Sequence, residues 1–430
     1  MSNDLDFSDS TILWSLYAQN MMVTERTLSA IQAESSLERS AEHVVNTARD
    51  HEAPELMARR EVVENRHRTI AAWLRDHDLF GLILSRPEHL AWIGAGADLS
   101  PTLQLWRNPV FVFVTEAHRM VVCDAVQSGR LFEEELFGLG FLHKEFPLDD
   151  GPQAMLSNLV TGRTVAWDMR LEDRPTLKAA LHTECRRMEP TERSSLRRLG
   201  RTLAMAVETT AANFDQGATE RDVAAQLVHR MIREGIQPVH VQVLGGDRAR
   251  HFRCSSPKNL PVTEWCVLTA TGRKDGLEAS LSRCVSFGKP SAALVREFET
   301  AAMAQTTGSF FSRPGESVGT IAPKIRRILE KQGFEDEWGR ESILASAGRP
   351  VAELLSVSNW PSAATIPAVS AWAWQIGVGQ ARCCETIVTD DDGYECVTMS
   401  RHSIWPTIDI AVKGQAVKCP GLLKREVRSA

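Results

Sequence analysis

The side chains best suited to nucleophilic chemistry lie in residues 251–257. Cys254 follows His251 by three residues, and a cysteine near a histidine can form a thiolate nucleophile. The same pattern also fits a buried cysteine beside a surface histidine, since free cysteine is among the most buried residue types. The segment is therefore a candidate site with a structural alternative.

A second group of thiols falls on segments predicted to be strands: Cys266, Cys284, Cys383, Cys384 and Cys396. Neighbouring residues on a strand point to opposite faces, so only one residue of a Cys-Cys pair can face a given pocket. Thiols that line a pocket could bind a soft metal or carry out redox chemistry. The alternative is that cysteine serves here as a small apolar strand residue.

The elements that must position these side chains follow two rhythms. Residues 79–185 alternate between apolar strand-like runs, such as 81–84, 109–114 and 164–167, and helical stretches, which is typical of an α/β domain with a mixed sheet. Pro190 and the acidic residues beside it predict the start of a long helix over 190–213. A second helix over 218–235, strands at 239–244, 265–271 and 282–287, helices at 292–306 and 318–332, and a mostly β ending are also expected.

The N-terminal region is expected to be a helical arm. Apolar residues between 11 and 50 are roughly helix-spaced. Pro54 is expected to end this helix, and a second helix is predicted from about 55 to 77.

Composition excludes several classes of function. The chain has 430 residues, 49 Lys+Arg against 55 Asp+Glu, and a formal net charge of -6. This balance argues against nucleic acid or an anionic membrane as the main partner. No apolar run reaches the roughly 18–20 residues that span a bilayer. Nine cysteines without C-x-x-C spacing, and a start that lacks signal-peptide features, indicate a cytoplasmic chain with reduced thiols.

Four motifs in order resemble the creatinase/Xaa-Pro aminopeptidase family, the pita-bread metallopeptidases. The stretch 81–92, a strand followed by Pro87 and Trp92, resembles the family's N-terminal domain. Residues 215–225 resemble its Gly-x-Thr-Glu helix pair. Residues 280–288 resemble its Asp-x-Thr-Arg strand, and residues 385–395 resemble its closing strand pair.

The resemblance implies a site for two divalent metals with five ligands, but this chain departs from it at four or more of the five positions. The two aspartates correspond to Thr269 and Ser280, eleven residues apart, and the histidine corresponds to Gly348. The two glutamates correspond to Gln375 and Cys384, or a one-residue shift makes Glu385 the retained glutamate. Such a set cannot neutralise two divalent cations. The sequence therefore predicts no metal and no other cofactor.

The resemblance also sets the expected site. The expected catalytic residues are Cys254, Cys384 and Glu385, and the expected substrate-binding residues are His251, Arg283, Gln375, Ser280 and Thr269. Arg283 is either free to bind an anionic substrate or a structural arginine paired with Glu385 or Glu278. Convergence of His251, Cys254, Glu278, Cys384 and Glu385 would favour catalysis.

The predicted fold is an α/β N-terminal creatinase-like domain followed by an α+β pita-bread domain. The expected boundaries are a helical arm at 1–55, the N-terminal domain at 56–188 and the pita-bread domain at 189–430. The first functional hypothesis is a metal-independent hydrolase or lyase acting at a C–N bond of a small amino-acid-like or guanidino substrate. The alternatives are an inactive pseudopeptidase that binds or scaffolds, and a conventional Xaa-Pro dipeptidase whose ligands are misplaced. A homodimer with a small-molecule ligand is expected.

Overall fold

The computed structural model describes residues 35–99, 110–340, 344–349, 365–391, 393–399 and 405–427, with side chains from residue 54 onward except at 344–346. It divides into two compact units, residues 1–58 and 59–430. The part of the expected N-terminal arm before residue 35 lies outside the described residues. Among the helices that are described, none is long and apolar enough to cross a lipid bilayer.

Helix α3 spans Ser35–Asp76 and runs through Pro54. The prediction that Pro54 separates two helices is therefore wrong. Proline removes one backbone donor and costs about 3 kcal/mol inside a helix. Its neighbours Ala53, Glu55 and Leu56 are strong helix formers, so helix is favoured on both sides of the lost hydrogen bond.

After α3, the chain forms a five-stranded mixed sheet in the order β4-β3-β2-β1-β5. Its strands are β1 (Gly81–Leu84), β2 (Phe111–Val114), β3 (Arg119–Asp124), β4 (Leu142–Phe146) and β5 (Val165–Trp167). The accompanying helices are α4 (Pro87–Ile93), α5 (Ala125–Arg130), α6 (Gln153–Val160) and α7 (Pro175–Arg186), with a π-helical turn at Leu131–Glu135. β1 pairs parallel with β5 and antiparallel with β2, as a mixed α/β sheet requires.

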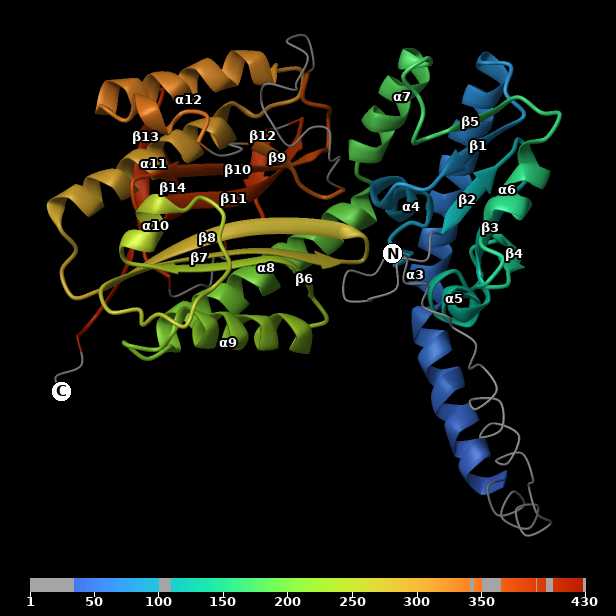
Figure 1. The fold of residues 1–430 in the computed structure, drawn as a ribbon, viewed down its shortest axis with the longest axis horizontal. Helices are drawn as coiled ribbons and strands as arrows, with labels where there is room; N and C mark the ends of the chain where they lie inside the picture. Colours follow the sequence, from blue (N-terminus) through green and yellow to red (C-terminus); the bar gives the residue numbers. More distant parts are fainter. Residues whose placement is uncertain are drawn as a thin grey trace, which may run out of the picture. The chain divides into compact units, whose positions relative to one another are not determined.

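The second half contains two four-stranded sheets (Figure 1). The first has the order β15-β8-β7-β6, formed by β6 (Gln237–Gly245), β7 (Trp265–Lys274), β8 (Leu277–Phe287) and β15 (Leu423–Arg425). The second has the order β12-β11-β10-β9, formed by β9 (Leu344–Ser346), β10 (Ala371–Val378), β11 (Ala381–Asp390) and β12 (Gly393–Cys396). The hairpin of β13 (Thr407–Val412) and β14 (Gln415–Pro420) is separate.

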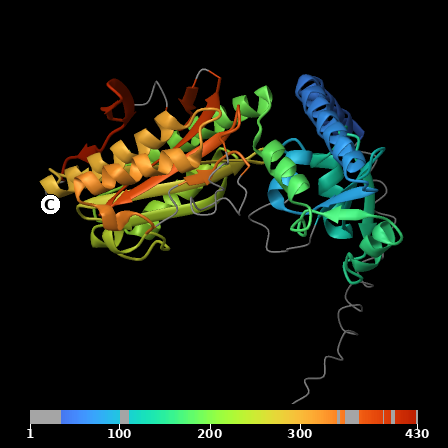
Figure 2. The same ribbon diagram turned by 90° about the horizontal axis from the view of Figure 1, so that it is seen from above.

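Two pairs of helices cover these sheets (Figures 1 and 2). α8 (Pro190–Asn213) and α9 (Glu220–Arg233) pack against β6, β7 and β8, and α11 (Ala292–Phe311) packs against β10 and β11, with α12 (Val318–Gln332) beside it. Two short turns of helix, α10 (Asp247–His251) and Glu335–Glu337, also lie in this half. The two sheets meet where β8 lies beside β11. The predicted order of an α/β part followed by an α+β part is present.

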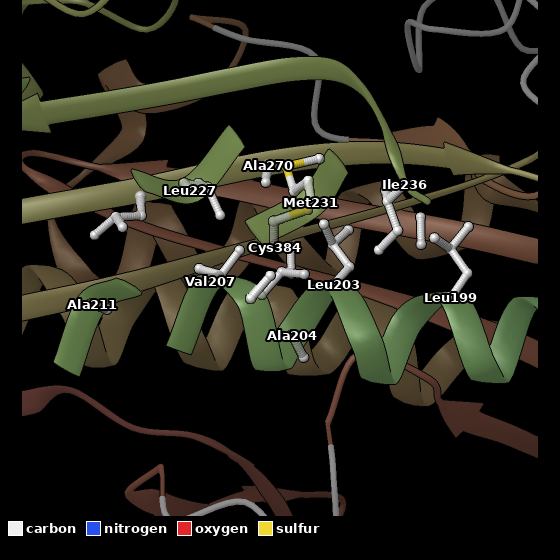
Figure 3. Packing of buried hydrophobic residues seen from close by; sticks show 14 of the residues in the cluster. Leu199, Leu203, Ala204, Val207, Ala211, Leu227, Met231, Ile236, Ala270 and Cys384 are labelled. Atoms are coloured by element: carbon white, nitrogen blue, oxygen red, sulfur yellow. The ribbon is translucent and has the colours of Figure 1, made fainter. Parts of the chain in front are cut away.

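The core between α8, α9 and the strands is built from regularly spaced apolar residues (Figure 3). Leu199, Leu203 and Val207 repeat every four residues along α8, which places them on one face, and all three are buried. They share a hydrophobic cluster with Met231 of α9 and with Cys384 of β11. One predicted pocket residue, Cys384, therefore belongs to the apolar core.

Candidate functional site

The β7–β8 hairpin carries paired hydroxyl groups on one face. The antiparallel register places Thr269 opposite Ser282 and Thr271 opposite Ser280. The hydroxyl oxygens are 2.8 Å apart in the first pair and 2.7 Å apart in the second. Thr269 and Ser280 are the positions to which the resemblance assigns two metal-binding aspartates. Each of these two hydroxyls is hydrogen-bonded to the hydroxyl of its cross-strand partner.

The strand β11 closes this face from the neighbouring sheet. The Thr386 hydroxyl donates to the carbonyl of Ser280 and accepts from its N–H, both at 2.8 Å. Gln375 of β10 stands opposite Cys384 of β11 in the register. Cys384 is only 1% exposed and lies in the apolar core. The resemblance assigns the family's two glutamates to Gln375 and to either Cys384 or its neighbour Glu385.

Gly348, to which the resemblance assigns the family's histidine, has a backbone conformation that favours glycine. Gly348 has a φ of +75°, a conformation that side-chain-bearing residues disfavour. Its N–H donates to the Glu278 carbonyl at 2.8 Å, and its carbonyl accepts the Glu278 N–H at 2.6 Å. This antiparallel bridge connects the hairpin to the segment before β10.

These residues do not form the donor set of a dimetal site. In the alignment that the resemblance implies, two neutral hydroxyls, an amide, a glycine and either the enclosed Cys384 thiol or the Glu385 carboxylate stand at the five ligand positions, whereas hard divalent ions prefer carboxylate oxygen. Across the described part of the chain, no group of three or more His, Cys, Asp or Glu side chains is arranged to hold a metal ion.

Arg283 adopts the paired arrangement that the sequence left open. Its guanidinium is 1% exposed and donates to Glu385 at 2.5 Å, to Glu208 of α8 at 2.8 Å and to the Thr398 carbonyl at 2.9 Å. The Thr398 hydroxyl donates to the other oxygen of Glu385 at 2.6 Å. Burial raises the pKa of Glu385, and Arg283 only partly offsets this. The network joins β8, β11 and α8.

Cys254, the predicted nucleophile, does not lie on the hydroxyl face of β7 and β8. His251 ends the short helix α10, and both His251 and Cys254 are exposed. Cys384 is enclosed in the core, and Glu385 is held by Arg283. An exposed thiol and an enclosed thiol do not line one pocket. The structure places Thr269 and Ser280 on the hydroxyl face of β7 and β8, and it pairs Arg283 of β8 with Glu385 of β11. His251 and Cys254 belong to neither group.

A cavity of about 180 Å³ adjoins the hydroxyl face, and the sequence did not predict it. Its charged lining residues are Glu88, Asp98, Arg273, Glu278 and Arg349. Arg273 and Glu278 form the next cross-strand pair beyond Thr271 and Ser280. The alternation of strand side chains places all these pairs on one face. Strand alternation, which places Glu278 on the same face as Thr269 and Ser280, is the sequence signal that could have pointed to this cavity.

Arg349, which lines the cavity, belongs to a buried ion cluster. Glu192 of α8 accepts from Arg66 at 2.7 Å and from Arg349 at 2.5 Å. Burial alone would raise the pKa of Glu192, but the two arginines lower it to about 2. The Glu192 carboxylate is therefore ionised near neutral pH and holds Arg349 in place.

Comparisons with known proteins agree with this architecture. Residues 194–366 match the model of metallopeptidase family M24. The structure superimposes on a prolidase from Pyrococcus horikoshii OT3 with a TM-score of 0.63 and 14% identity, covering 78% of this chain and 99% of that one. A dipeptidase PepE from Mycobacterium ulcerans gives a TM-score of 0.63 and 18% identity, covering 86% and 99%.

A third neighbour is of a different kind. The N-terminal domain of the FACT complex subunit SPT16 from chickpea gives a TM-score of 0.60 and 10% identity, covering 79% of this chain and 96% of that domain. No curated protein sequence matches the chain. At these identities the structural neighbours establish the fold, which is the pita-bread fold predicted from the motifs.

Proposed function

Because the chain belongs to the creatinase/Xaa-Pro peptidase family of pita-bread proteins, we propose that it is a member that works without the dimetal centre and binds a small amino-acid-like or guanidino molecule. The observation that carries this proposal is the face of β7 and β8. There Thr269 and Ser280, to which the resemblance assigns the family's two aspartates, pair their hydroxyls with those of Ser282 and Thr271. Self-satisfied neutral hydroxyls supply no negative charge for a divalent ion.

A binding role is favoured over catalysis by the separation of the reactive groups. Cys254 is exposed, Cys384 is in the core, and Glu385 is committed to Arg283 and Thr398. A nucleophile needs a base within hydrogen-bond reach, and the exposed Cys254 has no such partner among the contacts of the described residues. The similarity to a domain of a FACT complex subunit supports the view that this fold also serves in protein complexes.

A metal-independent enzyme acting at a C–N bond is the second candidate, and one observation favours it. Glu278 lies at the cavity, and burial raises the pKa of its carboxyl, with a further increase from the charge of Glu88. A carboxylic acid with a raised pKa is suited to donate a proton to a leaving nitrogen.

The direct test is hydrolysis of Xaa-Pro dipeptides by the purified full chain, with and without added Mn²⁺ or Co²⁺. We expect no turnover under either condition. Turnover that disappears with a chelator and returns with metal would overturn the proposal and restore the conventional dipeptidase.

Three further features are also proposed. The domain boundaries at 1–55, 56–188 and 189–430 divide the chain into an arm, an α/β domain and a pita-bread domain. A homodimer follows from the family resemblance and from the apolar residues of the arm, and a cytoplasmic location follows from the cysteine usage. Light scattering at micromolar concentration should give twice the 47.7 kDa chain mass, and a monomer mass would refute the dimer.

A further inference from the structure

The cavity beside the β7–β8 hairpin exposes carboxylate oxygens that have no hydrogen-bond partner in the described part of the chain. Glu278 Oε1 accepts from Arg273 Nε at 2.8 Å, and Glu88 Oε1 accepts from Arg86 Nε at 3.0 Å. The Oε2 atom of each carboxylate takes part in no such contact. Asp98 shows the same pattern, since Oδ2 accepts from Gln237 and Oδ1 does not accept.

The donors of the cavity are already engaged. Arg349 donates to Glu192 through two nitrogens and to the carbonyls of Cys185 and Arg187 at 2.8 and 2.6 Å. Arg273 directs two of its nitrogens at Glu278. The groups that remain open toward the cavity are therefore acceptors with negative charge. A complementary ligand has to bring N–H donors and positive charge.

Burial makes these acceptors effective. Glu88 and Glu278 are each 8% exposed, so a charge placed between them is weakly screened by water. Burial raises the pKa of Glu278, Arg273 opposes the rise, and the nearby charge of Glu88 adds to it. The effect of the Glu88 charge on Glu278 indicates that the two carboxylates, which both line the cavity, are close enough to interact, and a bound cation would relieve their repulsion.

The volume restricts the ligand to a small molecule. The cavity of about 180 Å³ compares with roughly 150 Å³ for an engineered protein cavity that binds benzene. The apolar part of its wall comes from Pro87, Ala91, Ala97 and Leu99. A compact head group with a short hydrocarbon substituent fits this combination of size and polarity.

We propose that this cavity binds a small organic cation with N–H donors, a guanidinium or a primary ammonium, between the carboxylates of Glu88 and Glu278. The inference deepens the proposed function, because it names the class of small molecule and needs no metal. It places the ligand one cross-strand pair beyond the hydroxyl pairs, at Arg273 and Glu278.

The test is isothermal titration of the full chain with four probes: methylguanidinium, methylammonium, neutral methylurea and acetate. We expect one site per chain for at least one of the two cations, and no binding of methylurea or acetate. The two cations distinguish guanidinium from ammonium recognition. Absence of binding by both cations, or equal binding of methylurea, would overturn the proposal.

Variants locate the site. Glu88→Gln and Glu278→Gln should each lower the affinity for the cation at least about tenfold, as expected for a lost charge-assisted hydrogen bond. Glu297→Gln is the matched control, since Glu297 is also buried and paired with an arginine, Arg250, but lies on α11 away from the cavity. Unchanged affinity in a folded Glu278→Gln protein would contradict the assignment.

A second variant covers the case in which a charge substitution prevents folding. Ala91→Leu fills the cavity and leaves every charged group in place, so it should abolish binding while the melting transition stays cooperative. Retained affinity in this variant would equally overturn the proposal. Failure of the proposed function would show separately, as metal-dependent dipeptide cleavage, whatever the cation titrations give.

The pH dependence provides an independent check. Glu278 must be ionised to hold a cation, and its pKa is raised, so affinity should increase as the pH rises through that pKa. The other charged groups that face the cavity are Glu88, Asp98, Arg273 and Arg349. Affinity that falls with rising pH would contradict the role of Glu278.

Discussion

Replacing Arg283 by methionine removes the cation that joins β8, β11 and α8. The guanidinium makes hydrogen bonds to Glu385, Glu208, the Thr398 carbonyl and the Ser282 carbonyl. Methionine keeps most of the side-chain length and its apolar packing. The variant therefore isolates the loss of charge and donors, and it leaves the buried carboxylate of Glu385 without its counter-ion.

The expected cost is about 3–5 kcal/mol, the range for breaking a buried ion pair by removing one partner. Protonation of Glu385 limits the loss, because burial already raises the pKa of this carboxyl. Glu385→Gln should cost less, about 1–2 kcal/mol, because the amide oxygen can still accept from Arg283 or Thr398. In that variant Arg283 also keeps its ion pair with Glu208.

The pH profile follows from the raised pKa of Glu385. The folded protein holds the proton of the Glu385 carboxyl more tightly than the unfolded chain does. The stability that this proton contributes is therefore fully present below about pH 4.5, the ordinary pKa of a glutamate. It is lost as the pH rises through the folded value. In Arg283→Met the folded pKa is higher still, because the neighbouring cation is gone, so the loss of stability should extend to higher pH.

Equilibrium urea unfolding, followed by the fluorescence of the eleven tryptophans, measures these differences. Arg326→Met is the control, because Arg326 forms an exposed i,i+4 ion pair with Glu330, and its replacement should cost less than about 1 kcal/mol. A cost for Arg283→Met that does not exceed the cost for Arg326→Met would refute the structural role assigned to this arginine.

Three further predictions concern the thiols and the turn. Iodoacetamide should modify exposed Cys254 first in the native protein, since burial raises the pKa of the Cys284 thiol to about 12; peptide mass spectrometry showing equal labelling of Cys284 would contradict this. Cys384→Ala should cost about 1 kcal/mol or more and lower the melting temperature, whereas Cys254→Ala should leave it unchanged; the reverse order would place Cys384 in a pocket. Gly348→Ala should cost about 1–2 kcal/mol in urea unfolding because of its positive φ, and an unchanged midpoint would show that the turn relaxes freely.

The sequence was most informative where local pattern determines structure. The helix expected at 318–332 is α12, Val318–Gln332, and the acidic start beside Pro190 is the start of α8. Strand β4 was not predicted because four of its five residues are exposed and carry no alternating apolar signal. Pro54 misled the helix assignment because a local rule was outweighed by helix-forming neighbours.

The candidate site could be predicted only in part, for a physical reason. Strand register follows from spacing, so the positions of Thr269 and Ser280 on one face of the hairpin could be anticipated. The partner of Arg283 depends on how β8, β11 and α8 pack, and the sequence left two alternatives open. The cavity at Glu88 and Glu278 joins residues 190 positions apart in the chain, from Glu88 of α4 to Glu278 of β8. No local pattern encodes such a contact.

The central claim is that the family's dimetal positions no longer bind metal in this chain. Elemental analysis of the full chain, purified without chelator and then incubated with Mn²⁺, Co²⁺ or Zn²⁺ and desalted, tests it most directly. The account predicts no stoichiometric transition metal in any sample. About two divalent ions per chain, lost on substitution of Glu385 or Cys384, would contradict it.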